Sequence, residues 1–315
     1  MSQLSAPRPP EKTSENWKRH VALFLASQNV SHFGSLLVQH AINWHITLTT
    51  QSGSMMMIAI ICAFLPMLLV TPFAGVWADR YNRRLLIIAA DALIALCTLA
   101  LALLFLAGYG SVWLLFAASA FRSLGAGIQM PAVGALLPQI TPVEHLTKVN
   151  AANSTIQSTV ALFSPMLGGA LLMAASIEAV FFVDVVTAAV AILIVWFFLK
   201  VGAHQKALAK QQATYLADLR EGARYIRRQP FLKAFFAFNA AFFLLLGPVA
   251  FLTPLQVARN FGDEVWRLTA IEVGFSAGMM LGGALMAVWG GFRNKVHSMA
   301  GSSPKLCVKI APGNG

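Results

Sequence analysis

The chain has 315 residues, of which 57% are hydrophobic and only 11% are charged, and its formal net charge is +11. A soluble domain carries about 25% charged residues. This chain has too little charge to cover a water-facing surface and too much apolar content to be disordered, so a soluble enzyme and a disordered protein are both excluded. The composition is that of a polytopic membrane protein.

Long apolar segments follow one another along the chain, and each can form a helix that crosses a hydrocarbon core, which takes about 20 residues. The eight segments are approximately 21–47, 54–76, 85–106, 112–136, 149–173, 178–199, 234–255 and 271–289. The sequence therefore predicts an all-α fold. Its expected parts are a tail (1–20), a six-helix bundle (21–199), a linker with an amphipathic helix (200–233), two helices of a second bundle (234–289) and a second tail (290–315).

Positive charge gathers on one side of the predicted membrane. Twenty of the 23 Lys and Arg residues fall in the tails and in the connections expected on that side, and only Arg259 and Arg267 fall on the other. An excess of Lys and Arg marks the cytoplasmic side. We therefore expect a multi-pass protein of the cell inner membrane with both termini in the cytoplasm. Topology, and not a nucleic-acid partner, explains the basic charge.

The sequence offers little for cofactor or metal chemistry. Its three cysteines are unclustered, so they predict neither a disulfide framework nor a metal site. No P-loop pattern for ATP is present, and no nucleophile lies beside a base. We expect no cofactor, no metal and no enzymatic activity.

The connection after the second segment carries a charged motif, Gly75-x-x-x-Asp79-Arg80-x-x-Arg83-Arg84. Gly75 would permit close approach of helices, and Asp79 can accept hydrogen bonds from arginines and from helix N-termini. Such a cluster can latch one conformation and release another. A plain basic turn that fixes topology is the alternative, and both interpretations can hold together.

This motif resembles the signature G-x-x-x-D-R-x-G-R-R/K of the major facilitator superfamily, apart from Asn82, a residue type that tolerates a left-handed backbone as glycine does. The resemblance covers residues 17 to 299 and is strongest to the drug and siderophore exporter branch, with its macrolide-efflux and enterobactin-export proteins. It implies a transporter built from two six-helix bundles, which exports small amphipathic molecules by alternating access in exchange for protons.

Only two helices of a second bundle are found, so the resemblance predicts a chain that is truncated after its eighth helix. The alternative function is therefore a transport-incompetent membrane fragment, for which self-association is one way to hide exposed faces. The expected partners are a small-molecule substrate, protons and the lipid bilayer.

Arg122, Asp91 and Asp184 are charged side chains that lie well inside the predicted spans. Arg122 is the one cation, and a central arginine costs about 2.5–3.5 kcal/mol on insertion scales, so it should face a cavity or a partner. The resemblance to a fourth-helix motif implies a role in proton coupling, and an ion pair with Asp91 or another helix is the alternative. Asp91 and Asp184 are candidates to carry a proton. Asp184 is favoured because it has no partner in its own segment, whereas Asp91 lies near the cytoplasmic end, where a pairing with Arg83, Arg84 or Arg122 is the alternative.

Polar side chains form stripes on the first, fourth and fifth predicted helices. Three stripes in one bundle predict an aqueous cavity for substrate, with polar contacts between helices as the alternative. The residues expected to line the cavity are Gln28, His32, Gln39, Asn43, Gln129, Asn153 and Gln157.

Small residues mark a contact between the fifth and eighth predicted helices. Pro165, Gly168 and Gly169 lie in a stretch that partly resembles the superfamily's antiporter motif. Gly274, Gly278 and Gly282 form a small-residue face on the eighth helix that is suited to close packing. Ordinary helix packing is the alternative interpretation, and it is compatible with antiport.

Overall fold

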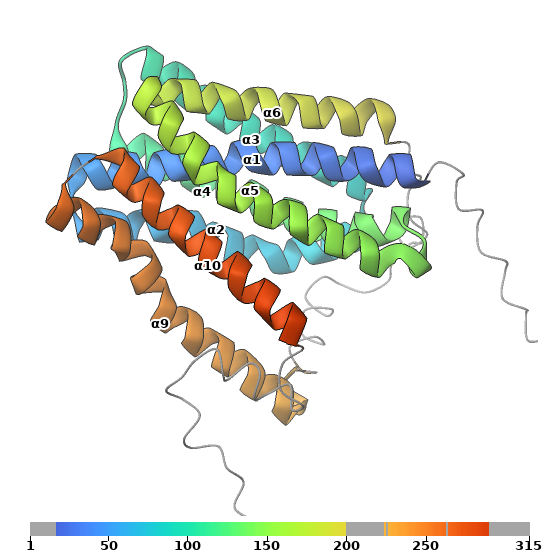
Figure 1. Cartoon of the computed structure of the whole chain (residues 1–315). Helices are drawn as coiled ribbons and strands as arrows, with labels where there is room; N and C mark the ends of the chain where they lie inside the picture. Colours follow the sequence, from blue (N-terminus) through green and yellow to red (C-terminus); the bar gives the residue numbers. More distant parts are fainter. Residues whose placement is uncertain (1–16, 200–223, 225, 263, 290–315) are drawn as a thin grey trace, which may run out of the picture.

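The computed structural model describes residues 17–199, 224, 226–262 and 264–289, which form helices and short connections without a strand (Figure 1). The long helices are α1 (Trp17–Thr50), α2 (Gly53–Arg80), α3 (Arg83–Leu106), α4 (Val112–Ile140), α5 (Leu146–Ala174), α6 (Ile177–Phe198), α9 (Pro230–Phe261) and α10 (Val265–Trp289). A 3-10 turn, Val143–His145, precedes α5. The amphipathic helix predicted within 200–233 and most of both predicted tails lie outside the described residues.

Length and composition make six of the described helices, α1 to α6, candidates to cross a membrane. The predicted all-α membrane fold is thereby confirmed. The seventh and eighth predicted segments correspond to α9 and α10, which are helical but are not among those six candidates. α1 and α9 begin a few residues earlier than the apolar runs predict, at Trp17 and Pro230. Polar residues extend α1, whereas Pro230 lies at the start of α9, where its fixed φ suits the first helical turn.

Side-chain caps explain where two helices begin. Asn82 adopts an extended backbone (φ −67°, ψ 110°), and its side-chain oxygen accepts a hydrogen bond from the Arg84 backbone N–H at 3.0 Å. Ser111 accepts one from the Trp113 backbone N–H in the same way. Asn82 thus caps α3. Its backbone is not left-handed, so the tolerance of asparagine for that conformation is not used here.

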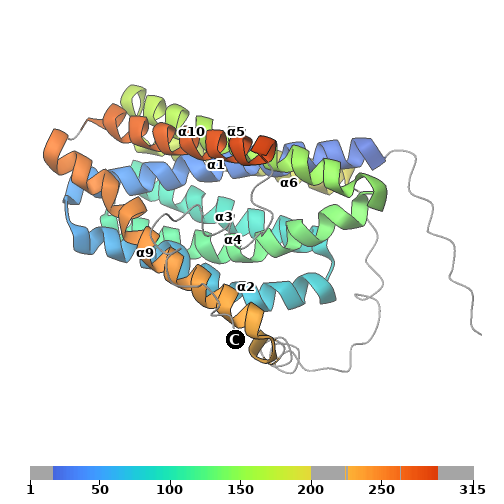
Figure 2. The ribbon, with the colours of Figure 1, turned by 60° about the horizontal axis from the view of Figure 1, so that its bottom comes forward.

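Helices α1 to α6 pack as a bundle in which α4 lies against α2 and α3, and α6 lies against α1 and α3. Two apolar clusters form its core, one containing Leu37, Ile42 and Phe181 and the other Phe24 and Ile87. α10 packs along α5, whereas α9 contacts α1 and α2. Away from that contact, the Pro230 end of α9 diverges from the bundle (Figures 1 and 2).

Close approach of α1 and α6 depends on Gly34. A Cβ at this position would lie 3.0 Å from the Cα of Asp184 and would collide with the Thr187 hydroxyl. Any larger residue would push the two helices apart. The absence of a side chain therefore lets α1 lie directly over the charged residue of α6.

Candidate functional site

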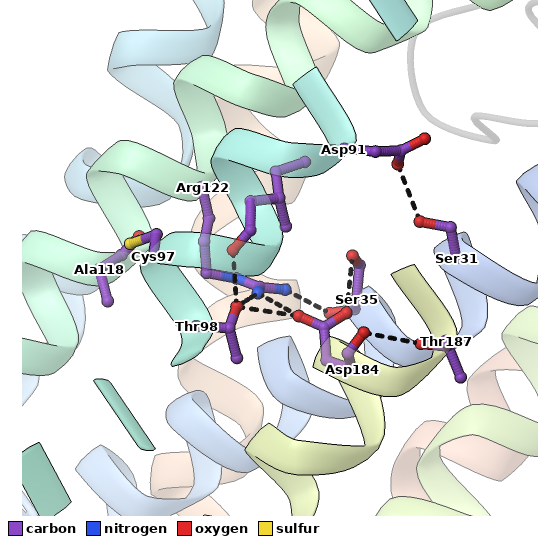
Figure 3. A network of polar contacts seen from close by, with 10 residues as sticks. Ser31, Ser35, Asp91, Cys97, Thr98, Ala118, Arg122, Asp184 and Thr187 are labelled. Carbon is purple, nitrogen blue, oxygen red and sulfur yellow. Dashed lines mark hydrogen bonds and ion pairs between the residues drawn. The ribbon is translucent and has the colours of Figure 1, made fainter. Parts of the chain in front are cut away.

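A buried network of polar side chains joins α1, α3, α4 and α6 (Figure 3). Arg122 of α4 forms an ion pair with Asp184 of α6, with 2.5 Å between Arg122 Nη1 and Asp184 Oδ2. Thr98 of α3 donates to the same carboxylate oxygen at 2.9 Å and accepts a hydrogen bond from Arg122. Ser35 of α1 donates to Asp184 Oδ1 at 3.2 Å, and its backbone carbonyl accepts from Arg122. Four helices are thus tied to one pair of opposite charges.

The Arg122–Asp184 pair is almost completely removed from solvent, with relative exposures of 6% and 0%. Burying two charges costs several kcal/mol each, and that cost is repaid only when the geometry is good and the remaining polar atoms are bonded. Here Asp184 receives donors at both oxygens. The pair therefore carries little net charge into the bundle.

Asp91 of α3 is equally buried, at 1% exposure, but its partners are neutral. Its Oδ1 accepts hydrogen bonds from the Ser31 hydroxyl at 2.9 Å and from Gln129 Nε2 at 2.7 Å. Its Oδ2 accepts one from Gln28 Nε2 at 3.5 Å. Among the described residues, Asp91 takes part in no ion pair.

The partners of the two carboxyl groups differ from those expected. For Asp91 one alternative was a pairing with Arg83, Arg84 or Arg122, and for Arg122 an ion pair with Asp91 or with another helix. Arg122 instead pairs with Asp184, and Asp91 contacts amides and a hydroxyl. Which side of α3 and α6 meets α4 depends on how the helices are rotated in the bundle, and spacing along the chain does not fix that.

Sequence reasoning missed two members of this network, Ser31 and Thr98. Both carry a signal in the helical spacing. Thr98 lies seven residues, about two turns, after Asp91, so the two share a face of α3. Ser31 lies between Gln28 and Ser35 at helical spacing, on the polar stripe of α1.

The residues predicted to line a cavity do not form one set. Gln28 is buried and Gln129 is half-buried, and both contact Asp91 inside the bundle. Their amides therefore hold α1, α3 and α4 together, as the alternative of polar contacts between helices describes.

The remaining five cavity candidates lie nearer the surface of the bundle. Gln39 and Asn43 of α1 are half-buried, and Gln39 donates to Asn43 at 3.1 Å. Asn153 of α5 is half-buried and accepts a hydrogen bond from the side-chain amide of Asn29 of α1 at 3.4 Å. His32 and Gln157 are exposed. These side chains are more accessible than the two that contact Asp91.

The motif in the α2–α3 turn fastens the turn to α4. Arg83 donates to the carbonyls of Ala78 at 2.9 Å and of Ala135 at 2.8 Å, and to Gln139 Oε1 at 3.2 Å. It also forms an ion pair with Asp79 at 3.4 Å, of which Asp79 is the exposed partner. Arg83 therefore bonds one backbone carbonyl near the end of α2 and one near the end of α4, where helix carbonyls favour a cation.

Arg84 fastens the same turn to α6. It donates to the backbone carbonyls of Val195, at 3.1 Å, and of Trp196, and its guanidinium lies over the Trp196 ring. Arg80 is the last residue of α2. A Cβ at Gly75 would have none of the described residues within 4 Å, so the described helices make no close approach there. The turn is held by its arginines, and not by its glycine.

Gly169 of α5 faces α10 closely, because a Cβ there would collide with the side chain of Thr269. Ser276 of α10 also donates to the Ala161 carbonyl of α5 at 3.4 Å. Pro165 is buried in α5, and Gly168 lies against α1 near Leu37.

The expected packing face of the eighth helix is wrong. A Cβ at Gly274, Gly278 or Gly282 would have none of the described residues within 4 Å, those of α5 included. Thr269 and Ser276 make the contacts with α5, and they lie on a different face of α10 from these glycines.

A bundle of apolar helices around buried charges is typical of proteins that carry solutes across membranes. Residues 20–304 match the family model described as Major Facilitator Superfamily, and the chain belongs to that superfamily. The resemblance drawn from the motif around Asp79 is thereby confirmed. The protein is a multi-pass membrane protein of a transporter family.

Several curated relatives are similar to this chain. It is 27% identical over 283 residues to Macrolide efflux protein A of Streptococcus pyogenes, which covers 89% of this chain and 69% of the relative. It is 26% identical over 247 residues to Macrolide efflux protein A of Enterococcus faecalis, and the match covers 78% of this chain and 76% of the relative. Over 119 residues it is 30% identical to Multidrug resistance protein 1 of Bacillus subtilis (strain 168), and the match covers 38% of this chain and 29% of the relative.

Proposed function

We propose that the chain is a secondary active transporter that exports small amphipathic molecules, drug-like or siderophore-like, by exchange with protons. The similarity to macrolide efflux proteins over most of this chain supports export. The observation that carries proton coupling is the buried Arg122–Asp184 pair with Asp91 nearby on α3. Ionisable groups are costly at membrane depth, and they commonly mark ion pathways there.

In this proposal the protein lies in the cell inner membrane with both termini in the cytoplasm. The excess of Lys and Arg in the tails and in the α2–α3 turn supports that orientation. The substrate then meets the surface-near polar side chains of α1 and α5: His32, Gln39, Asn43, Asn153 and Gln157.

The α2–α3 turn acts as the conformational latch. Arg83 and Arg84 fix the turn to α4 and α6, so the turn moves with the bundle as one body. Asp79 is left exposed and partly paired, and it is available to bond another part of the protein in one conformation only. Gly75 and Arg80 complete the motif in this proposal.

Efflux measured in cells tests the proposal. A panel of fluorescent drugs and a macrolide would be loaded into cells that lack their own exporters, with and without this chain. We expect export that stops when an uncoupler removes the proton gradient. An equal rate of loss from cells with and without the chain contradicts the transport function.

Arg122 offers a matched comparison for coupling. Arg122→Lys keeps a cation opposite Asp184, whereas Arg122→Ala leaves that carboxylate buried and unpaired. We expect Arg122→Ala to reduce proton-driven export at least tenfold and Arg122→Lys to reduce it less. Unchanged export by Arg122→Ala, at equal protein in the membrane, contradicts a role in coupling.

A further inference from the structure

Four exposed cations gather where α9 begins. Arg224, Arg227 and Arg228 are helical residues that come just before α9, and Lys233 lies in its first turn. Arg224 and Arg228 are four residues apart, so they share a face of that helical stretch. These four residues form a positive surface, which we call the α9 patch.

The charge of the α9 patch is not balanced within the chain nearby. No Asp or Glu occurs between residues 222 and 262. In the part of the chain that the structure describes, the ion pairs join other side chains and include no member of the patch. The arginines of the α2–α3 turn differ, because Arg83 and Arg84 donate to backbone carbonyls. The patch therefore presents positive charge to an anion from outside the chain.

Apolar surface begins directly beside the α9 patch. Phe236 lies three residues after Lys233, on the same face of α9, and it is 51% exposed. Its ring meets the ring of Phe235 edge to face. The apolar run 234–255 starts at the residue after Lys233. Cations at the end of an apolar membrane helix lie at the depth of the phospholipid headgroups. A ligand that fits both surfaces has an anionic group on an apolar body.

The position of α9 leaves the patch accessible from the membrane. α9 contacts α1 and α2, but its Pro230 end diverges from the bundle in both views (Figures 1 and 2). The side chains of Arg227, Arg228 and Lys233 are exposed there. The described helices of the bundle do not cover the patch, so headgroups of the surrounding bilayer can reach it.

We propose that the α9 patch binds the phosphate groups of anionic phospholipids, and that these lipids fasten the Pro230 end of α9 to the membrane surface. A guanidinium group matches the geometry of phosphate oxygens and can bind them through two N–H donors at once. Each Lys or Arg near an anionic membrane surface adds to the attraction. Lipid binding does not depend on transport, so it can be measured in a chain that exports nothing.

Native mass spectrometry of the full chain in detergent tests lipid binding. Phosphatidylglycerol, which is anionic, and phosphatidylcholine, whose headgroup has no net charge, would be added in turn. We expect phosphatidylglycerol to bind about tenfold more tightly, because the patch attracts its charge. Equal affinity for the two lipids overturns the proposal. Displacement of the lipid by an equal concentration of inorganic phosphate also overturns it, since the apolar surface beside the patch would then contribute nothing.

Two double variants decide where the lipid binds. Arg227→Gln with Arg228→Gln removes an adjacent pair of cations from the patch. Lys18→Gln with Arg19→Gln is the matched control, because it removes an exposed adjacent pair at the start of α1. We expect the first variant to bind phosphatidylglycerol about fivefold more weakly and the control to bind it as the unmodified chain does. Equal losses in both variants would mean that only the overall positive charge matters, which overturns the site.

A conservative variant distinguishes lost charge from a disturbed fold. Arg227→Lys with Arg228→Lys keeps both charges but replaces the planar guanidinium groups, so it should keep most of the affinity for phosphatidylglycerol. Binding as weak as in the glutamine variant would show that charge does not hold the lipid, and the proposal would fail.

Spin labels test whether the lipid fastens α9. Labels at the exposed positions Ala237 of α9 and Leu85 of α3 report the distance between this end of α9 and the bundle. We expect a narrower distance distribution in nanodiscs that contain phosphatidylglycerol than in nanodiscs of phosphatidylcholine alone. Arg227→Gln with Arg228→Gln should remove that narrowing. The same distribution in both lipids would overturn the fastening of α9.

Discussion

At the scale of single residues, the two halves of the buried ion pair depend on each other. Asp184 has no exposed surface, and Arg122 has almost none. Removing one charge leaves the other buried without a counterion, whereas removing both leaves no charge to bury. The energetic role of the pair is therefore separable from its role in transport.

Asp184→Asn should destabilise the folded protein by about 3–5 kcal/mol, because it strands the Arg122 guanidinium. The double variant Arg122→Gln with Asp184→Asn should recover most of that loss. Thermal unfolding of both variants in detergent measures the difference. A double variant as unstable as the single one would show that hydrogen bonds, and not charge, dominate this contact.

The sequence identifies Arg122, Asp91 and Asp184 as charges within apolar helices, and all three are buried. What it cannot supply is the pairing. Whether Asp91 or Asp184 meets Arg122 depends on the rotation of α3 and α6 about their axes, which the packing at Gly34 helps to set. The spacing of residues along the sequence shows which of them share a face of a helix. It does not show which neighbouring helix that face contacts.

At the scale of helices, the α2–α3 turn shows a local motif that works through the backbone. Asn82 caps α3, and its neighbours Arg83 and Arg84 bond carbonyls near the ends of α4 and α6. The residues of the motif can be recognised in the sequence. The cap was not predicted, because the position was interpreted through the glycine that the superfamily usually has there.

Asn82→Ala should lower the free energy of unfolding by about 0.5–2 kcal/mol, because the α3 N-terminus loses its capping acceptor. Asn82→Asp keeps an acceptor at the same place and should have little effect. Asn82→Gly should cost only a few tenths of a kcal/mol. Chemical denaturation in detergent would measure all three, and equal losses for alanine and aspartate would contradict the cap.

At the scale of the whole molecule, the described fold has a tight bundle, α1 to α6, and a helix that leaves it. α10 is held along α5, but α9 meets α1 and α2 and then diverges toward Pro230 (Figure 1). Apolar segments predict the helices well because length and hydropathy are local properties. How α9 is tilted depends on contacts between distant parts of the chain, which the segments do not encode.

One of those contacts joins α9 to the α1–α2 turn. The Arg259 guanidinium donates to the backbone carbonyl of Gln51, through Nε at 3.2 Å and Nη2 at 2.5 Å. Gln51 has a positive φ of 46°, in the left-handed region that glycine adopts more readily. Because the acceptor is a main-chain oxygen, the Gln51 side chain is not needed for the link.

Arg259→Ala should therefore let α9 move more widely relative to α2. Spin labels at the exposed positions Met57 of α2 and Phe261 of α9 would report this as a broader distance distribution. Arg267→Ala is the matched control, because Arg267 pairs with nearby Glu264 at the start of α10. Gln51→Gly should leave the distribution narrow, since it keeps the carbonyl and relieves the left-handed backbone. Equal broadening by Arg259→Ala and Arg267→Ala would mean that this link does not hold α9 in place.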